Sequence, residues 1–489
     1  MRLSSLMQGI DIVGCSVQLD IEISNIISDH RKGTKNSIFV AINGTKRNGN
    51  DYIENARKNG AIAVVTDSEE TYKNTDNCVL VKNARRALAK MWSNYYGNPS
   101  RSIKTVAITG TNGKTSSAYF LYNILREAGV PCALISTIEC LVNNERIETS
   151  GGGSVVDISS AMTTPDPEAL YYLYNKMKEK DVKVAVIEAS SHALGQERLS
   201  SVDIEIGAFT NLSREHLDYH KTVEQYFEAK KKLFEICKYC VVNIDDEYGC
   251  KLADIRTDAV CISKNEGSNF YATNIDCSAK GCKYDLVSND GKTTINSSIA
   301  GDFTVYNTML AVVCAKLLQI DNNAIRKGIK RTKSIKGRME KYKDKSIYID
   351  YAHTPKSVEQ IIKSVRQIEP FKRLIVLFGC GGDRDKGKRA EMGKIATEQA
   401  DYAIITTDNP RTEEPIQIIN DIISEITEKN NYLVIPDRKE AITYLAKSIK
   451  ENEVAVLLGK GHEEYEIIGQ EKRYFNEREI LNEVFKIDL

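Results

Sequence analysis

Continuous apolar runs alternate with amphipathic segments along most of this chain. Short apolar runs bounded by turn residues are typical of strands that are buried on both faces of a parallel sheet. Segments with helical periodicity, such as SSAYFLYNILREAG, separate these runs. The alternation predicts α/β units, and the last two units are predicted to be doubly wound. The runs are TVAIT, VKVAVIEAS, IGAFTNLS and YCVVNIDD, then SIYIDYAH, RLIVLFGCGG, DYAIITTDNP, NYLVIPD and EVAVLLGKG.

The same pattern suggests where one domain ends and the next begins. In the first part, the runs SIFVAI and AIAVVTD flank a helical pattern, NDYIENARKNG. A helix follows in NARRALAKMWSNYYG, and NPSRS breaks the pattern as a linker. The strand alternation restarts after about Lys336. We therefore expect three domains, over residues 1–98, 99–335 and 336–489, a number that suits a chain of 489 residues.

Composition narrows the class of protein. The 67 basic and 67 acidic residues cancel, which argues against a nucleic-acid binder, because such proteins normally carry a basic excess. No apolar run is long enough to span a bilayer, and the N-terminus lacks the pattern of a signal peptide. The twelve cysteines are scattered, and the close pair Cys237 and Cys240 has no second pair at matching spacing. We expect buried free thiols in a reducing cytoplasm.

A shortened phosphate loop follows the strand TVAIT. The usual loop is G-x-x-x-x-G-K-[ST], but here Ile108 stands where the outer glycine belongs, and Gly110 is the nearest glycine. Gly110 and Gly113 allow close approach to phosphate, and the helix that begins near Lys114 directs its free N–H groups to the same place. Lys114 can reach the outer phosphates, and Thr115 can bind Mg²⁺. We favour nucleotide binding over an ordinary glycine turn.

Further polar residues follow the strands. Glu188 closes an apolar run, where an acidic side chain is costly unless it meets a cation; the alternative is a solvated carboxylate at the strand end. Five of the six histidines also lie in polar motifs after strands, and they are His192, His216, His220, His353 and His462. A single histidine is often structural, but five at strand ends suggest a site.

Taken in order, the motifs resemble those of the Mur ligases. They are GTNGKTS, EASSHALGQER, FTNLSREHLDYHKTVEQYFEAKKKLF, GRME, DYAHTP, GGDRDKGKR, DNPRTEEP and GKGHE, and they extend over essentially the whole chain. The resemblance implies a three-domain α/β architecture with a central P-loop-type parallel sheet and a C-terminal Rossmann-like domain. It also implies a cytoplasmic monomer, without nucleic-acid partners or a membrane span, that works in peptidoglycan precursor synthesis.

The implied reaction is ATP-driven amide formation. A substrate carboxylate attacks the γ-phosphate of ATP, and an amine then displaces phosphate from the acyl phosphate. By this resemblance the catalytic residues are Lys114, Glu188, His216 and Lys230. ATP binding is implied for Gly110, Thr111, Asn112, Gly113, Lys114, Thr115, Ser116, Asn307, Arg338 and Asp350. Magnesium is implied at Thr115, Glu188, His216 and Lys230, the last as a carbamylated lysine; taken alone, Lys230 would be placed on a solvated helix face.

The resemblance also implies both substrate sites. UDP-N-acetylmuramoyl-L-alanyl-D-glutamate is expected at His30, Thr163, Thr164, Ser190, Gln196 and Arg198. The amino-acid site resembles the meso-diaminopimelate type, at Arg384, Asp408, Asn409, Pro410, Arg411, Gly459 and Glu463. Arginine can hold the second carboxylate of diaminopimelate in a fork geometry that lysine cannot supply, and Glu463 can meet its ammonium.

Four features depart from the family pattern. His30 replaces the serine of an Asp-Ser-Arg motif, and residues 48–52, NGNDY, replace Asp-Gly-His-x-Phe. Thr304 stands where asparagine is usual. The stretch ETSGGGSVVDISSAMTTP is longer and richer in glycine than expected, which suggests a different loop over the dipeptide or a modified substrate.

Two alternatives remain open from the sequence. The same ligase chemistry could use another amino acid, such as L-lysine or lanthionine. A nucleotide-binding scaffold that has lost ligation is the second alternative. Decay at Lys114, Glu188, His216 or Lys230 would favour the scaffold, and all four residues are intact.

Overall fold

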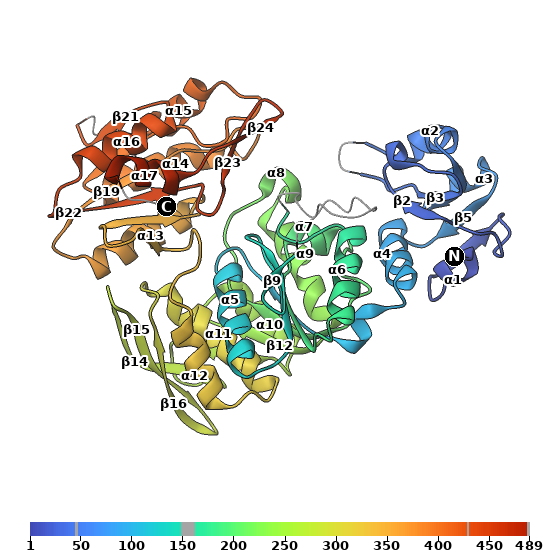
Figure 1. The fold of residues 1–489 in the computed structure, drawn as a ribbon, viewed down its shortest axis with the longest axis horizontal. Coiled ribbons are helices and arrows are strands. Elements are labelled where there is room, and N and C mark those ends of the chain that lie inside the picture. Colours follow the sequence, from blue (N-terminus) through green and yellow to red (C-terminus); the bar gives the residue numbers. More distant parts are fainter. Residues whose placement is uncertain (45–46, 148–161, 428–429, 487–489) are drawn as a thin grey trace. The chain divides into compact units, whose positions relative to one another are not determined.

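The computed structural model describes residues 1–44, 47–147, 162–427 and 430–486 (Figure 1). The chain forms two compact units. Residues 1–109, 130–207 and 229–239 make the first, and residues 110–129, 208–228 and 240–489 make the second. Among the helices of the described ranges, none combines the length and the apolar character that crossing a membrane requires.

The first unit begins with a five-stranded sheet in the order β1-β5-β4-β3-β2. Strand β1 runs antiparallel to β5 and the other neighbours are parallel, as the apolar runs SIFVAI and AIAVVTD predict. Helices α2 and α3 pack on β4 and β5 (Figure 1). The strands are β1 (Ile12–Cys15), β2 (Asn25–Ile27), β3 (Ser37–Val40), β4 (Ala61–Thr66) and β5 (Cys78–Val81). The helices are α1 (Leu3–Leu6), η1 (His30–Lys32), η2 (Gly49–Tyr52), α2 (Ile53–Lys58), α3 (Glu69–Lys73), α4 (Ala84–Tyr95) and η3 (Pro99–Ser102).

A second set of strands in this unit positions the catalytic candidates. Strand β10 lies between β6 and β7, parallel to both, and β8 and β9 continue antiparallel from β7. The β6–β10 register places Glu188 opposite Ile108, at the end of β6 that leads into the phosphate loop. The strands are β6 (Lys104–Thr109), β7 (Cys132–Ile135), β8 (Cys140–Val142), β9 (Glu145–Arg146) and β10 (Val184–Glu188), and the helices are α6 (Pro167–Glu179) and α7 (Ser191–Gly195).

In the second unit, helix α5 follows the phosphate loop and packs against α11 and α12. Gly328 permits this contact, because a Cβ there would lie 2.4 Å from the Cα of Ile124. Strands β12, β13 and β14 are parallel, and β14, β15 and β16 form an antiparallel meander that the sequence analysis missed. Residues of β11 (Ile204–Phe209), α9 (Val223–Ile236) and β12 (Cys237–Asn243) are divided between the two units. The other elements are α5 (Lys114–Glu127), α8 (Leu217–His220), α10 (Glu247–Ile255), β13 (Val260–Ser263), β14 (Phe270–Ser278), β15 (Gly281–Ser288), β16 (Gly291–Ser297), α11 (Phe303–Leu317) and α12 (Asn322–Arg331).

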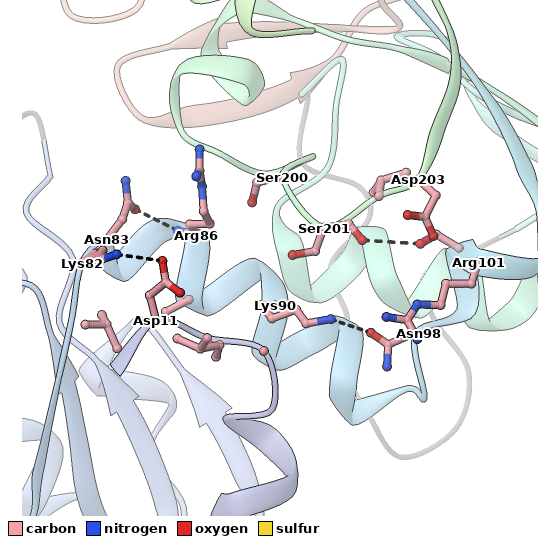
Figure 2. Close-up of a pocket in the computed structure, with 16 residues that line it drawn as sticks. Asp11, Lys82, Asn83, Arg86, Lys90, Asn98, Arg101, Ser200, Ser201 and Asp203 are labelled. Carbon is pink, nitrogen blue, oxygen red and sulfur yellow. Dashed lines mark hydrogen bonds and ion pairs between the residues drawn. The ribbon is translucent and has the colours of Figure 1, made fainter. Parts of the chain in front are cut away.

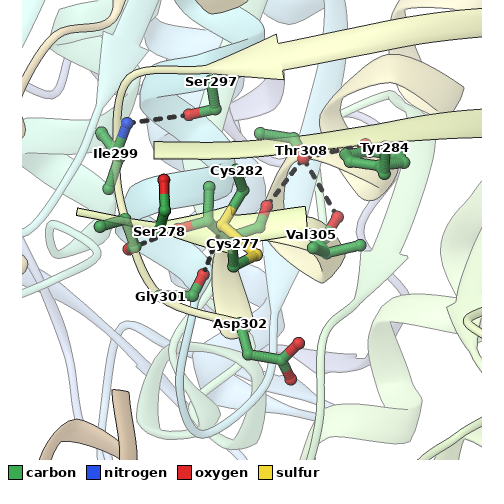
Figure 3. The surroundings of a disulfide bond; sticks show 12 residues. Cys277, Ser278, Cys282, Tyr284, Ser297, Ile299, Gly301, Asp302, Val305 and Thr308 are labelled. Carbon is green, nitrogen blue, oxygen red and sulfur yellow. Dashed lines mark hydrogen bonds between the residues drawn. A yellow bond between two sulfur atoms is a disulfide. The ribbon is translucent and has the colours of Figure 1, made fainter. Parts of the chain in front are cut away.

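The meander corrects the prediction made for two of the cysteines. Cys277 and Cys282 are directly opposed on β14 and β15 and form a disulfide (Figure 3). The prediction of buried free thiols is therefore wrong for this pair, and Cys15 and Cys250 are free but exposed. A separation of five residues did not reveal the pairing, because it depends on the register of a hairpin that was not predicted.

The rest of the second unit is the doubly wound sheet expected from the apolar runs. Its order is β17-β18-β22-β19-β20-β21, and β17 alone is antiparallel to its neighbour. Along β19, Leu374, Val376 and Phe378 join one apolar core with α13, α14 and α15, whereas Ile375 and Leu377 join another with α16 and α17. Both faces are thus covered. The elements are β17 (Glu340–Lys341), β18 (Ile347–Asp350), α13 (Pro355–Ile368), β19 (Arg373–Phe378), α14 (Gly387–Gln399), β20 (Tyr402–Ile405), α15 (Pro415–Ile423), β21 (Tyr432–Val434), α16 (Arg438–Ser448), β22 (Glu453–Leu458), β23 (Tyr465–Ile468), β24 (Glu471–Tyr474) and α17 (Glu477–Phe485).

Candidate active site

The backbone conformation and the close packing of the phosphate loop favour glycine at two of its positions. Gly110 and Gly113 adopt φ values of 143° and 85°, which side chains rarely allow. A Cβ at Gly110 would lie 1.9 Å from Oγ1 of Thr210, and a Cβ at Gly113 would lie 2.4 Å from Oδ1 of Asn307. The loop is therefore packed tightly between two other segments, and Asn307 lies against it.

Residues of the motif FTNLS fasten the loop. The amide of Thr111 donates to the carbonyl of Asn211 at 2.8 Å, and the amide of Asn112 donates to its Oδ1 at 3.1 Å. Oγ1 of Thr210 donates to the carbonyl of Asn112 at 2.6 Å. Sequence reasoning quoted this motif but assigned nothing to Thr210 or Asn211. These contacts occupy the amides of Thr111 and Asn112, and helix α5 begins directly after the loop, at Lys114.

Lys114, Arg338 and Asp350 were predicted to bind ATP, and the first two have contacts at the start of α5. The Nζ of Lys114 donates to the carbonyls of Gly110 and Thr111 at 2.9 and 2.8 Å. Arg338 donates to Oγ1 of Thr115 at 3.1 Å. Asp350 is buried and accepts from the amides of Met339 and Ala352, and burial raises its pKa although Arg338 opposes the change. Two cations, Lys114 and Arg338, therefore lie at the start of α5.

Glu215 joins two histidines that sequence analysis singled out. Nε2 of His353 lies 2.8 Å from Oε1 of Glu215, and Nε2 of His216 lies 3.7 Å from Oε2. Burial opposes ionisation of Glu215, but His216, His353 and Lys114 together hold its pKa well below the usual value. Glu215 was missed by the sequence analysis, although its position directly before His216 was a signal.

Two histidine rings flank Tyr351. The ring centres of His353 and His462 lie 4.8 and 4.9 Å from that of Tyr351, and the guanidinium carbon of Arg338 lies 4.8 Å from the same ring centre. Burial, with help from Arg338, lowers the pKa of His462 to about 3. His462 is therefore a neutral ring near neutral pH, and it cannot neutralise a phosphate.

Glu188 and Lys230 meet the end of β6. Glu188 is fully buried and accepts from the amide of Thr137 at 2.9 Å and from its hydroxyl at 3.1 Å. Lys230 is 1 % exposed, and its Nζ lies 3.4 Å from Oγ1 of Thr109, the residue before the loop. Both solvent-exposed alternatives are thus wrong, and Thr137 is a partner of Glu188 that sequence reasoning missed.

Five of the six residues predicted for the UDP-dipeptide form one polar network. Thr164 donates from Oγ1 to the carbonyl of Glu188 at 2.7 Å and accepts from the amide of Ser190 at 2.9 Å. Arg198 donates to the carbonyl of Thr164 at 2.7 Å and to Oε1 of Gln196 at 2.7 Å. Thr163 joins the network through Thr137, because the hydroxyls of these two residues lie 3.1 Å apart. The network is continuous with Glu188.

The sixth residue, His30, lies outside this network in the described part of the chain. Its ring stacks on Tyr52 with centres 4.7 Å apart and planes at 7°. His30 and Tyr52 come from two motifs that depart from the family pattern, so these two departures contact each other. The third departure, Thr304, is buried and donates to the carbonyl of Ala300. Most of the fourth, the glycine-rich stretch, falls in residues 148–161, outside the described residues.

Asn409 is the centre of the predicted amino-acid site. Its Nδ2 donates to Oε2 of Glu463 at 2.9 Å, and its Oδ1 accepts from Nζ of Lys460 at 3.0 Å. Lys460 is fully buried and also pairs with Asp408 at 3.4 Å. Burial opposes ionisation of Asp408, but Lys460 lowers its pKa, whereas burial and then Asp408 raise the pKa of Glu463. Lys460 was missed, although it lies within GKGHE.

The two predicted arginines approach the same glycine. A Cβ at Gly381 would lie 2.9 Å from Nη1 of Arg411 and 3.8 Å from Cγ of Arg384. Arg411 is half-buried, and its Nη1 donates to the carbonyl of Gly382 at 2.8 Å. Burial, and then the charge of Arg384, lowers the pKa of Arg411. A bound carboxylate would relieve the repulsion between the two cations.

Pro410 and Gly459 complete the predicted amino-acid site. Pro410 precedes Arg411, which has a φ of 53° and donates its amide to the carbonyl of Ile467. A Cβ at Gly459 would lie 3.0 Å from Oδ2 of Asp408. Arg384, Asp408, Asn409, Pro410, Arg411, Gly459 and Glu463 therefore come together from three loops at the carboxyl ends of β19, β20 and β22, which is where ligands bind in such sheets.

Comparison with known proteins supplies an independent observation. Three family profiles match the chain: the Mur ligase family catalytic domain over residues 22–96, the Mur ligase middle domain over 108–315, and the Mur ligase glutamate ligase domain over 337–461. The chain is 37% identical over 497 residues to the UDP-N-acetylmuramoyl-L-alanyl-D-glutamate--2,6-diaminopimelate ligase of Clostridium perfringens, covering 99% of this chain and 100% of the relative. The protein of the same name from Caldanaerobacter subterraneus is 39% identical, covering 99% of both.

A solved structure agrees with these relatives. It carries the same ligase name, is 28% identical, and superposes with a TM-score of 0.68 over 99% of both chains. The three-domain α/β architecture of this family is therefore present in the chain.

Proposed function

The chain belongs to the Mur ligase family, and we propose that it uses ATP to join meso-2,6-diaminopimelate to UDP-N-acetylmuramoyl-L-alanyl-D-glutamate, as a step of peptidoglycan precursor synthesis. Relatives named for this reaction match the chain from end to end. The observation that carries the choice of amino acid is the pair Arg384 and Arg411 at Gly381, beside Glu463 and Asn409. Those charges suit a molecule with a carboxylate and an ammonium at its far end.

Each domain has a role in this proposal. Residues 1–98 bind the UDP-muramoyl part, residues 99–335 bind ATP, and residues 336–489 bind the amino acid. The three matched ranges, 22–96, 108–315 and 337–461, lie within these boundaries and support them. We also propose that the protein is a monomer and works in the cytoplasm.

The first step forms an acyl phosphate. A carboxylate oxygen of the dipeptide attacks the γ-phosphorus of ATP, the bond to the β–γ bridging oxygen breaks, and ADP leaves. Lys114, Arg338 and the N-terminus of α5 hold the phosphates and neutralise the charge that shifts to the leaving oxygen. Thr164, Ser190 and Arg198 orient the dipeptide beside the loop edge.

Part of the proposed donor set suits magnesium. Glu188 is a buried carboxylate and Thr115 a hydroxyl, the oxygen donors that this cation prefers, and His216 completes the set. In the part of the chain that the structure describes, no three His, Cys, Asp or Glu side chains gather as a ready metal site. When bound, the ion would neutralise charge on the transferring phosphate.

Lys230 is proposed to act as a carbamate. Its ammonium first loses one proton, and the neutral amine then adds to carbon dioxide with the loss of a second proton, so the charge of the side chain changes from +1 to −1. Burial favours the neutral amine that this reaction needs, because a buried charge is costly. The resulting carboxylate would place a negative group near Thr109, where it could serve as an oxygen donor to magnesium.

The second step joins the amino acid. The neutral amine of diaminopimelate attacks the acyl carbon, the carbon–oxygen bond to phosphate breaks, and inorganic phosphate leaves with a proton released from nitrogen. Arg384 and Arg411 are proposed to hold the far carboxylate, and Glu463 the far ammonium. Binding at three points fixes the attacking nitrogen.

One experiment tests the proposal against its alternatives. The purified protein receives ATP, magnesium, the UDP-dipeptide and, in separate reactions, meso-diaminopimelate, L-lysine or lanthionine. Phosphate release and the mass of the product are measured. We expect a product with diaminopimelate, whereas a product with another amino acid alone would replace the specificity. Absence of phosphate release with every amino acid would favour the nucleotide-binding scaffold.

A further inference from the structure

A cavity of about 370 Å³ in the first unit has no part in the proposed reaction. Its walls come from four segments: residues 9–11, the end of β5 with the first half of α4 (81–90), residues 98–101 and residues 200–203 (Figure 2). The volume lies at the lower end of the range for small-molecule sites. None of the residues assigned above to ATP, the dipeptide or the amino acid lines it.

Four basic side chains line the cavity, together with the carboxylates of Asp11 and Asp203. Two of them have acidic partners, because Lys82 pairs with Asp11 at 3.3 Å and Arg86 with Glu197 at 3.3 Å. The other two, Lys90 and Arg101, have no carboxylate within ion-pair distance in the described residues. Figure 2 shows that both belong to the same end of the cavity as Asn98.

Lys90 is the more buried of these two cations. Its Nζ donates to Oδ1 of Asn98 at 2.9 Å, which satisfies a hydrogen bond but not the charge. Burial, and then the neighbouring charge of Arg101, lowers the pKa of Lys90, and Asp203 opposes the change. Two like charges in a partly buried pocket repel each other, so a bound anion would stabilise both.

We propose that this cavity is a binding site for a small phosphate-bearing anion, held by Lys90 and Arg101 with Ser201 beside them. A phosphate offers three acceptor oxygens to these donors and neutralises both cations. The cavity is large enough for a phosphate that carries a sugar-sized group.

The site also adjoins the proposed dipeptide network. Arg86 lines the cavity and pairs with Glu197, which lies between Gln196 and Arg198 in the chain. Glu197 has a φ of 58°, an uncommon conformation for this residue type. If the proposed function holds, an anion that attracts Arg86 weakens its pairing with Glu197 and raises the KM for the UDP-dipeptide.

The test is direct binding, and it does not depend on ligase activity. Isothermal titration calorimetry uses the full chain carrying Lys114→Ala, so that phosphate is not held by the loop. The probes are inorganic phosphate and ribose 5-phosphate. In this background, adding Lys90→Met with Arg101→Met should weaken binding at least tenfold. Adding Lys73→Met with Arg146→Met, which removes the same charge from exposed positions outside the cavity, should leave it unchanged.

The outcomes separate clearly. Tighter binding of ribose 5-phosphate than of phosphate identifies an organic phosphate as the natural class, and the reverse order identifies free phosphate. Arg101→Ala alone, at an exposed side chain, should lower affinity while leaving thermal unfolding unchanged. Equal affinities in the cavity variant and the control variant, or no binding of either probe, overturn the proposal whatever reaction the protein catalyses.

Discussion

The phosphate loop and the amino-acid site are built in opposite ways. The loop is a single segment of six residues, from Gly110 to Thr115, whose shape depends on two glycines and on Asn211. The amino-acid site is assembled from three loops that are far apart in sequence, and buried charges such as Lys460 and Asp408 hold it.

This difference separates general chemistry from specificity. In the proposed function the loop presents backbone groups and one lysine to phosphates that are the same in every ATP reaction, so changes there should abolish turnover with any amino acid. The amino-acid site places charges to match one substrate, so changes there should alter KM and selectivity while leaving phosphoryl transfer intact.

The largest effect is expected at Lys114. Lys114→Ala removes charge from the site of phosphoryl transfer, and we expect a loss of kcat of about a thousandfold or more. Steady-state phosphate release measures it, and circular dichroism verifies the fold. Near-normal turnover would show that the short loop is not the ATP site.

Lys230 tests whether the catalytic region extends beyond the loop. Lys230→Ala should lower kcat by about a hundredfold or more, because it removes the group proposed to become an acid near Thr109. Lys231→Ala, at the adjacent and less buried lysine, is the matched control and should retain activity. Added formate or acetate should restore part of the activity of Lys230→Ala. An inactive Lys231→Ala beside an active Lys230→Ala would contradict the assignment.

Arg411 tests the other side of the comparison. Arg411→Ala should raise the KM for diaminopimelate roughly a hundredfold, because a half-buried carboxylate loses its partner. The KM values for ATP and the UDP-dipeptide should change little. L-lysine should be a poor substrate of the wild type, since it offers an ammonium to two arginines. Comparable kcat/KM for lysine and diaminopimelate would refute the specificity while leaving the ligase assignment intact.

The smallest effect is expected from the pH dependence of amino-acid binding. Burial and then Asp408 raise the pKa of Glu463, so its carboxylate takes up a proton at a higher pH than an exposed glutamate does. As pH falls through that raised pKa, the negative charge that meets the ammonium is lost and the KM for diaminopimelate should rise. Glu463→Gln should show a high KM with a flatter pH profile. An unchanged pH profile in Glu463→Gln would assign the titration to another group.

Local patterns in the sequence determined much of this molecule. Apolar runs predicted the strands of the doubly wound sheet, because such strands need apolar side chains on both faces. The loop was recognisable because its glycines, lysine and threonine lie within six consecutive residues. The meander of β14, β15 and β16 was not predicted, since polar residues alternate along exposed strands and resemble a loop.

Tertiary structure alone decided which polar residues act together. Lys230 is one of three consecutive lysines, and only the packing of α9 buries it while Lys231 remains partly exposed. The partners of Glu215, Thr137 and Lys460 could not be identified from local patterns, because they lie 138, 51 and 51 residues away. The disulfide and the cavity beside Lys90 depend in the same way on which strands and loops meet. Sequence specifies the local chemistry, whereas long-range packing sets burial and therefore the charge that each group can keep.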